Sequence, residues 1–149
     1  MAVVDKTFGE VAEDESGTIY LDEFEDGVRS LIMRGPCALC AYMGVPFDHP
    51  LAGFEYDILP IECHGGFTFA GEGTEENKWP EGFYWYGWDY GHCDDKSFYE
   101  IVNATGDRDR KAWTPKLVLN DSWSARYEFK KLMSLAEQIV SKKYKIATS

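Results

Sequence analysis

Two short stretches of the chain combine residue types that bind metal ions or transfer protons. Residues 62–66 read Glu-Cys-His-Gly-Gly, and residues 89–95 read Asp-Tyr-Gly-His-Cys-Asp-Asp. Imidazole and carboxylate groups are the usual protein ligands of zinc, manganese and iron. The same groups act as general acids and bases without a metal ion, because histidine titrates near neutral pH.

The four side chains of interest are His64, Asp89, His92 and Asp95, which lie near the ends of predicted β-strands. If these strands pair, their ends bring the four groups together, as a divalent metal site or as catalytic residues. Two other interpretations stay open: a ligand pocket without catalysis, or carboxylates that only bind loop backbone and water. The spacing is less specific than that of the His-Glu-x-x-His zinc motif.

Gly65 and Gly66 are candidate ligand-binding residues, because backbone amides in glycine-rich loops hold phosphate or an oxyanion. A plain turn or bulge is the favoured alternative, since no helix pattern follows the pair as nucleotide-binding fingerprints require. Trp88 is a further candidate. It belongs to an aromatic run, residues 83–89, that either stacks a nucleobase or fills the core.

The four cysteines are expected to be free thiols. Cys37 and Cys40 have the Cys-x-x-Cys spacing of zinc and redox sites, and Cys63 and Cys93 each adjoin a histidine. However, residues 37 and 40 lie in an apolar, strand-like run and would face opposite sides of it. We therefore favour buried free thiols over a zinc site.

The composition is that of one globular domain. The chain has 149 residues, of which 44% are hydrophobic, enough for a single core. Its net charge of −11 disfavours direct binding to nucleic acid, which needs a basic surface. No apolar run has the length of a membrane span and no signal-peptide pattern occurs, so we expect a cytoplasmic protein with no membrane partner.

Charge is distributed unevenly along the chain. Residues 1–26 hold nine acidic side chains and one basic side chain, whereas residues 126–149 hold six basic and two acidic ones. Residues 1–17 are polar with little periodicity, which suggests a flexible acidic arm. An acidic surface of this kind usually serves solubility, and it can also mask a host protein.

Hydrophobic periodicity predicts a set of short strands followed by one helix. Apolar residues recur at steps of three and four along residues 123–142, as on one face of an amphipathic helix. The predicted strands are residues 18–21, 28–33, 37–45, 61–64, 67–70 and 83–89. Residues 1–149 are therefore expected to form a single α+β domain, with a twisted, mainly antiparallel sheet and a long C-terminal helix packed on it.

Three stretches also carry a family likeness. Residues 44–57, 64–71 and 86–95 contain, in turn, a Gly-Val-Pro to Tyr-Asp segment, a His-Gly-Gly-Phe-Thr-Phe-Ala-Gly run and a Tyr-Gly-Trp-Asp-x-x-His-x-x-Asp run. In this order they resemble an uncharacterised family of small bacteriophage and prophage proteins, over about residues 38–140. The acidic extension before Val28 and the four cysteines depart from the family pattern.

The resemblance implies a phage setting without a settled activity, and it adds His49 to the candidate ligand-binding residues. A host cytoplasm is then the expected location, and a counter-defence role becomes a hypothesis. The main expectation is a hydrolase that acts on a small phosphorylated or nucleotide-like ligand, with or without a divalent metal ion. The alternative is a non-catalytic protein that sequesters a nucleotide signal or masks a host protein through its acidic surface. The sequence leaves open whether the protein is an enzyme.

Overall fold

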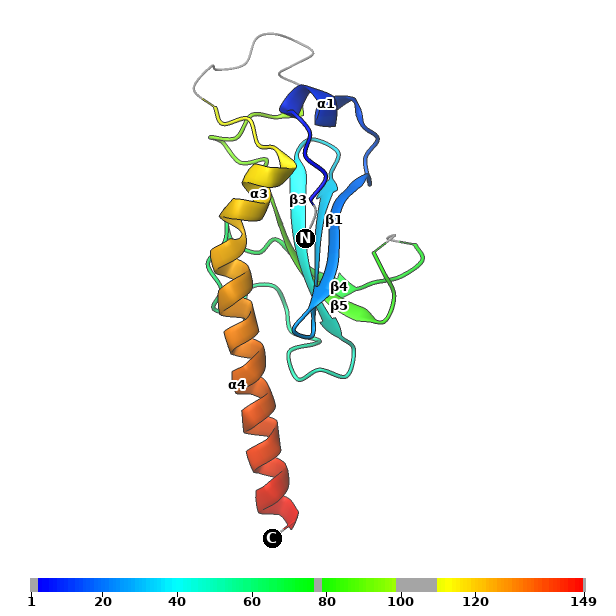
Figure 1. The fold of residues 1–149 in the computed structure, drawn as a ribbon. Helices are drawn as coiled ribbons and strands as arrows, with labels where there is room; N and C mark the ends of the chain where they lie inside the picture. Colours follow the sequence, from blue (N-terminus) through cyan, green and yellow to red (C-terminus); the bar gives the residue numbers. More distant parts are fainter. Residues whose placement is uncertain (1–2, 77–78, 99–109, 149) are drawn as a thin grey trace.

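A five-stranded antiparallel sheet with a long helix running along it forms the protein (Figure 1). The computed structural model describes residues 3–76, 79–98 and 110–148. The strands are β1 (Ile19–Glu25), β2 (Val28–Arg34), β3 (Leu39–Pro46), β4 (Phe69–Glu72) and β5 (Phe83–Asp89), and the helices are α1 (Phe8–Glu13), α3 (Pro115–Asp121) and α4 (Trp123–Thr148). The strand order is β1-β2-β3-β5-β4. The predicted α+β domain, with an antiparallel sheet and a C-terminal helix on it, is confirmed.

The hairpin between β1 and β2 is set by Asp26 and Gly27. Both residues have positive φ angles, 55° and 81°. Two-residue hairpin loops favour this backbone geometry, and Asp-Gly is one of the sequences that adopt it readily. Glu25 therefore pairs with Val28 directly across the turn, which fixes the register of the acidic outer strand β1.

The aromatic strand β5 lies inside the sheet, between β3 and β4. Successive side chains of a strand point to opposite faces, and both Trp85 and Tyr86 are fully buried. Gly44 on β3 pairs with Trp85, and any side chain at Gly44 would collide with the indole ring. The missing side chain thus lets Trp85 cover the neighbouring strand.

Helix α4 packs on the sheet through the first half of its length. Ala125, Phe129 and Met133 are buried, and the Phe129 ring lies 5.9 Å from that of Tyr86 on β5. The second half of α4 continues past the end of the sheet (Figure 1), where Ile139 is exposed. Over the described residues, no helix is both long and apolar enough to cross a membrane.

The acidic N-terminal stretch, predicted as a flexible arm, contains helix α1. Thr7 and Glu10 form a reciprocal capping box: the Thr7 hydroxyl accepts from the Glu10 amide at 3.2 Å, and the Glu10 carboxylate accepts from the Thr7 amide at 3.0 Å. Phe8 and Val11 are buried. The helix is therefore docked on the body, and its sequence signal was the Thr-x-x-Glu spacing.

Residues 61–64 were predicted to be a strand, and this prediction is wrong. They belong to a loop, residues 47–68, that connects β3 to β4. The buried apolar side chains of this loop are Leu51, Leu59, Ile61 and Phe67. The apolar residues of this stretch are buried, but they do not pair with a strand. Gly65 and Gly66 adopt positive φ angles of 72° and 79°, and this backbone conformation interrupts an extended strand.

Truncation of the contact between α4 and the sheet gives a first test. Phe129→Ala should lower the free energy of unfolding by about 3–5 kcal/mol, because it leaves a cavity against Tyr86. Urea unfolding followed by tryptophan fluorescence measures the change. Ile58→Ala, at an exposed position, is the control and should change stability by less than about 0.5 kcal/mol. Similar losses from both variants would contradict the buried position of Phe129.

Candidate functional site

A buried carboxylate, that of Asp95, is the centre of the predicted site. Its Oδ2 lies 2.7 Å from Nε2 of His64 and also accepts the backbone N–H of His92 at 2.9 Å. Its Oδ1 accepts the indole N–H of Trp113 at 2.7 Å. Asp95 is 4% exposed, so both carboxylate oxygens are held by protein groups.

These contacts keep Asp95 ionised at neutral pH. Burial alone raises the pKa of the carboxyl group, but the hydrogen bonds from His64, the His92 amide and Trp113 together outweigh it and lower the pKa below its ordinary value. A carboxylate beside Nε2 of His64 favours the tautomer with its proton on that nitrogen, so that His64 donates to Asp95. Nδ1 of His64 is then the ring nitrogen available for proton transfer.

The His64 ring is held between aromatic side chains. It stacks on Tyr90 at 4.6 Å with an interplanar angle of 13°, and Trp113 meets it edge-on at 5.1 Å. The Tyr90 hydroxyl accepts from the indole N–H of Trp88 at 3.1 Å and donates to Asp121 at 2.7 Å. Because Asp121 ends α3, this chain of contacts joins the site to the helices.

His92 supplies a second imidazole next to the first. Its ring centroid lies 5.6 Å from that of His64, and its Nε2 lies 3.6 Å from Oδ1 of Asp89. A side chain at Gly65 would collide with the His92 ring, and Gly65 also has a positive φ angle. Glycine is therefore required at position 65 for two reasons, and the imidazole of His92 takes the space of the missing side chain.

Short backbone contacts fix the segment that carries these groups. Asp89 accepts the amide of Gly91 at 2.9 Å, immediately after β5. The amide of Lys111 donates to the carbonyl of Asp94 at 3.0 Å, in a short parallel bridge between Asp95 and Lys111. The Lys111 ammonium lies 4.1 Å from the Trp113 ring centroid, which brings one positive charge to the edge of the site.

The structure brings three of the four predicted residues into one cluster. His64, His92 and Asp95 share direct contacts, and Asp89 reaches the cluster only through His92. No group of three or more His, Cys, Asp or Glu side chains within the described ranges is placed to hold a metal ion. The contact between His64 and Asp95 is of the imidazole–carboxylate type that acid–base catalysis uses.

Three of the predicted ligand-binding residues have other contacts. The Gly66 amide donates to the carbonyl of Cys63 at 2.9 Å, as in a turn. Trp88 is 2% exposed, so its ring supports Tyr90 from within the core. His49 accepts the Leu51 amide at 3.0 Å and lies 3.5 Å from Glu137 on α4. These residues support the loop, the core and the helix contact.

The four cysteines are free, as predicted, but only two of them are shielded. Cys37 and Cys93 are exposed, and Cys40 and Cys63 are partly buried. Burial raises the pKa of the Cys63 thiol to about 12 and that of Cys40 to about 11. These two thiols are therefore protonated at neutral pH and are poor nucleophiles.

The contacts that Trp113, Tyr90 and Asp121 make at the site were not predicted from the sequence. Trp113 stands alone in a polar stretch and meets Asp95 across 18 residues of sequence, so no local pattern marks it. Tyr90 directly follows the predicted strand, and its hydroxyl donates a hydrogen bond to Asp121, which lies 31 residues later in the sequence. Both contacts depend on how distant segments fold together.

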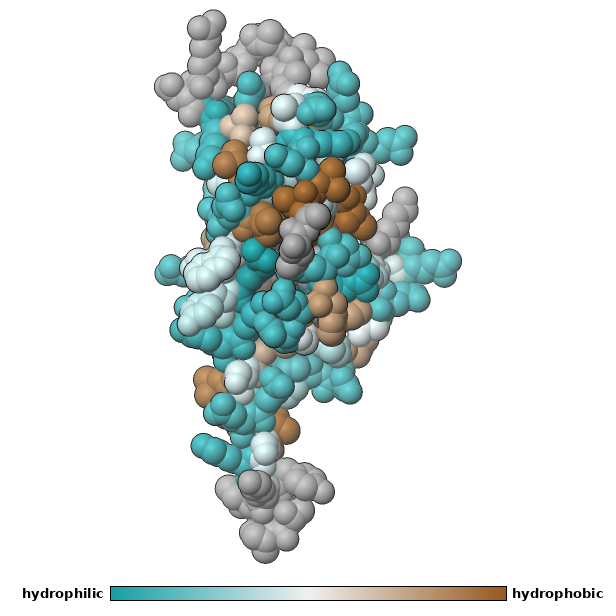
Figure 2. Space-filling model, in the orientation of Figure 1, coloured by the Kyte–Doolittle hydropathy of each residue, from teal (hydrophilic) through white to brown (hydrophobic). Residues whose placement is uncertain are grey.

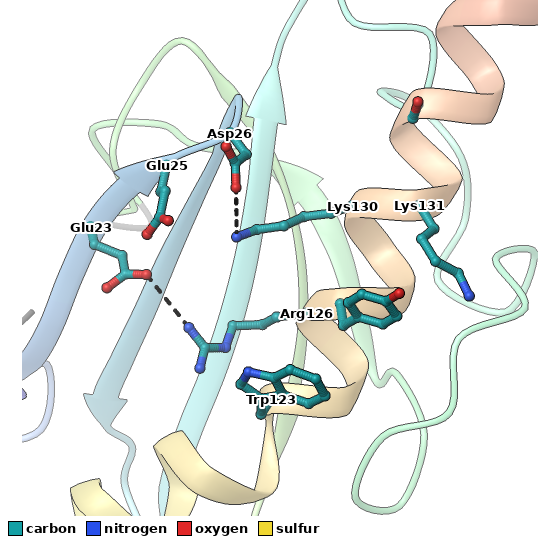
Figure 3. Close-up of a pocket in the computed structure, with 9 residues that line it drawn as sticks. Glu23, Glu25, Asp26, Trp123, Arg126, Lys130 and Lys131 are labelled. Carbon is teal, nitrogen blue, oxygen red and sulfur yellow. Dashed lines mark hydrogen bonds and ion pairs between the residues drawn. The ribbon is translucent and has the colours of Figure 1, made fainter.

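A groove between the β1–β2 hairpin and α4 was also missed (Figure 3). It has a volume of about 590 Å³. Two ion pairs cross it, from Arg126 to Glu23 at 3.5 Å and from Lys130 to Asp26 at 3.2 Å. Oε2 of Glu23 and Nε of Arg126 are buried there without a hydrogen-bond partner. The feature of the sequence that points to this groove is the concentration of acidic residues before position 27 and of basic residues after position 125.

No family model, curated protein or solved structure matches the chain. The resemblance to small phage proteins therefore stays a prediction.

The lowered pKa of Asp95 predicts an acid-sensitive contribution to stability. Because the pKa is below its ordinary value of 3.8 in the folded state, the ionised group stabilises the fold above that value. The contribution is lost as pH falls through the folded-state pKa. Asp95→Asn should reduce the unfolding free energy at neutral pH by about 1–3 kcal/mol, with a smaller further loss in acid than the wild type shows.

Urea unfolding at neutral pH and at about pH 3 measures this difference. Asp94→Asn, at the exposed neighbouring position, is the matched control and should keep the wild-type pH dependence. Equal acid sensitivity in the wild type and Asp95→Asn would show that Asp95 does not carry it.

Proposed function

We propose that the protein is a hydrolase that cleaves a small phosphorylated or nucleotide-like molecule by acid–base catalysis. The observation that carries this proposal is the 2.7 Å contact between His64 and the buried Asp95, next to a second imidazole whose ring is 5.6 Å away. A buried carboxylate that orients a histidine is a recurring arrangement in general-base catalysis. Both histidine side chains are partly exposed, at 25% and 39%.

In the proposed reaction, Nδ1 of His64 takes a proton from a water molecule. The water oxygen attacks the phosphorus atom, and the bond between phosphorus and the leaving oxygen breaks. His92, in its protonated form, donates a proton to that leaving oxygen. Asp95 stays ionised and stabilises the imidazolium of His64 while the proton is held there.

The charge around the cluster favours a small substrate over a nucleic-acid chain. Lys111 provides a cation beside Trp113, and a protonated His92 would provide another. Asp89 and Asp94 lie in the same segment, and the whole chain carries a net charge of −11. A net negative charge disfavours a polyanion, whereas one phosphate group can be matched locally by Lys111.

Histidine substitutions test the proposal with a matched control inside the chain. His64→Gln and His92→Gln should each lower kcat by about 10²- to 10⁴-fold, the usual contribution of a general base or acid. His49→Gln, the third histidine of the chain, should leave kcat unchanged. Product release from a panel of phosphomonoesters, phosphodiesters and nucleotides gives the rates.

The pH dependence of kcat/KM separates the two roles. Loss of His64 should remove the acidic limb of a bell-shaped profile, and loss of His92 should remove the basic limb. Retained turnover in both variants rules out the assignment. A nucleotide that raises the Tm of the protein without being cleaved would instead support sequestration.

A further inference from the structure

The exposed side of α4 carries a row of large side chains spaced four residues apart. Trp123, Tyr127, Leu135 and Ile139 are 63%, 49%, 52% and 55% exposed, and Lys131 occupies the middle position. Residues at i, i+4, i+8 form a continuous ridge on a helix, of the kind that packs into the groove of another helix. We call these five residues the α4 ridge.

We propose that a second copy of this chain packs antiparallel against the α4 ridge and forms a two-fold symmetric dimer. The proposal is independent of the chemistry assigned to His64. It follows from the exposure of the ridge, from the charges along α4, and from the acidic side chain of Glu23 beside the start of the ridge.

The ridge is apolar on a side of α4 that the sheet does not cover. The sheet packs against Ala125, Phe129 and Met133, which lie on another side of the helix. The part of α4 beyond the sheet bears hydrophobic side chains among hydrophilic ones (Figure 2). Monomeric soluble proteins seldom expose a contiguous row of this kind, and such rows mark protein interfaces.

Charge selects the antiparallel orientation. The sequence has three lysines between residues 142 and 145, whereas the β1–β2 hairpin carries Asp22, Glu23, Glu25 and Asp26. A parallel pair of helices would place the two lysine-rich ends side by side. An antiparallel pair separates these ends and places Lys142 of each copy near Glu23 of the other, because Glu23 lies beside Asn120.

Symmetry then fixes the register. In an isologous contact centred on Lys131, Trp123 of one copy meets Ile139 of the other, and Tyr127 meets Leu135. Two lysines meet at the centre, but each already has a carboxylate partner, because Lys131 lies 3.2 Å from Glu128 in its own chain. The ridge therefore pairs each exposed aromatic ring with an exposed aliphatic side chain.

The same register brings a lysine of the second copy close to Glu23. It places Lys142 of the second copy opposite Asn120, which lines a depression of about 450 Å³ together with Glu23 and Trp123. The ammonium group of Lys142 would lie at the mouth of this depression, where it adds a positive charge close to the Glu23 carboxylate.

Light scattering during size exclusion, with the full chain, tests the dimer. The wild type should be dimeric at high micromolar concentration, and Leu135→Glu and Ile139→Glu should each raise the dissociation constant at least about tenfold. Ile58→Glu, at a position 59% exposed in the 47–68 loop, is the control and should leave the dimer intact. A monomeric wild type, or a dimer indifferent to both ridge substitutions, overturns the proposal.

Spin labels test the orientation. A label at Lys142→Cys, in a chain with Cys37→Ser and Cys93→Ser, avoids the two exposed native thiols. With a rise of 1.5 Å per residue, the two labels should be about 35 Å apart in the antiparallel dimer and about 15 Å apart in a parallel one. The longer distance supports the proposed arrangement, and the shorter one overturns it.

Discussion

The carboxylate of Asp95 is the constraint on which this end of the molecule depends. It joins three segments: the loop that carries His64, the turn that carries His92, and the stretch before α3 that carries Trp113. A charge in a buried position is tolerated only when its hydrogen bonds are complete. The three segments therefore hold the charge in place, and the charge holds the three segments together. Stability and the geometry of the proposed site come from the same contacts.

Strands and helices were predictable where the spacing of apolar residues along a short stretch indicates them. The site was predictable only in part. The limits of β5 and the start of α4 follow from alternation and from three- and four-residue spacing, so the sequence located them well. Residues 61–64 were mistaken for a strand because a buried loop has the same apolar content as a strand. The residue types of His64, His92 and Asp95 were informative, but Trp113 became part of the site through a contact that no local pattern encodes.

The two halves of helix α4 lie in different surroundings. Its first half completes the core through Phe129, and its ion pairs with Glu23 and Asp26 attach it to the β1–β2 hairpin. Its second half extends beyond the sheet (Figure 1). A helix that exceeds the surface it covers must find another partner or expose apolar groups to water. The charge separation in the sequence, acidic at one end and basic at the other, is only partly neutralised within one chain.

The acidic strand β1 has a consequence for solubility in crowded solution. It is an outer strand of the sheet, and outer strands offer unpaired backbone groups to which other chains can add. Residue 4 already occupies one of these positions, since its amide donates to the carbonyl of Tyr20 at 2.9 Å. Farther along, Asp22 and Glu25 are exposed, and any strand approaching in register would have to desolvate them. At the opposite edge, β4 has only four residues. One edge strand, β1, thus carries exposed acidic side chains, and the other, β4, is too short to pair extensively. Both features protect the sheet from edge-to-edge aggregation.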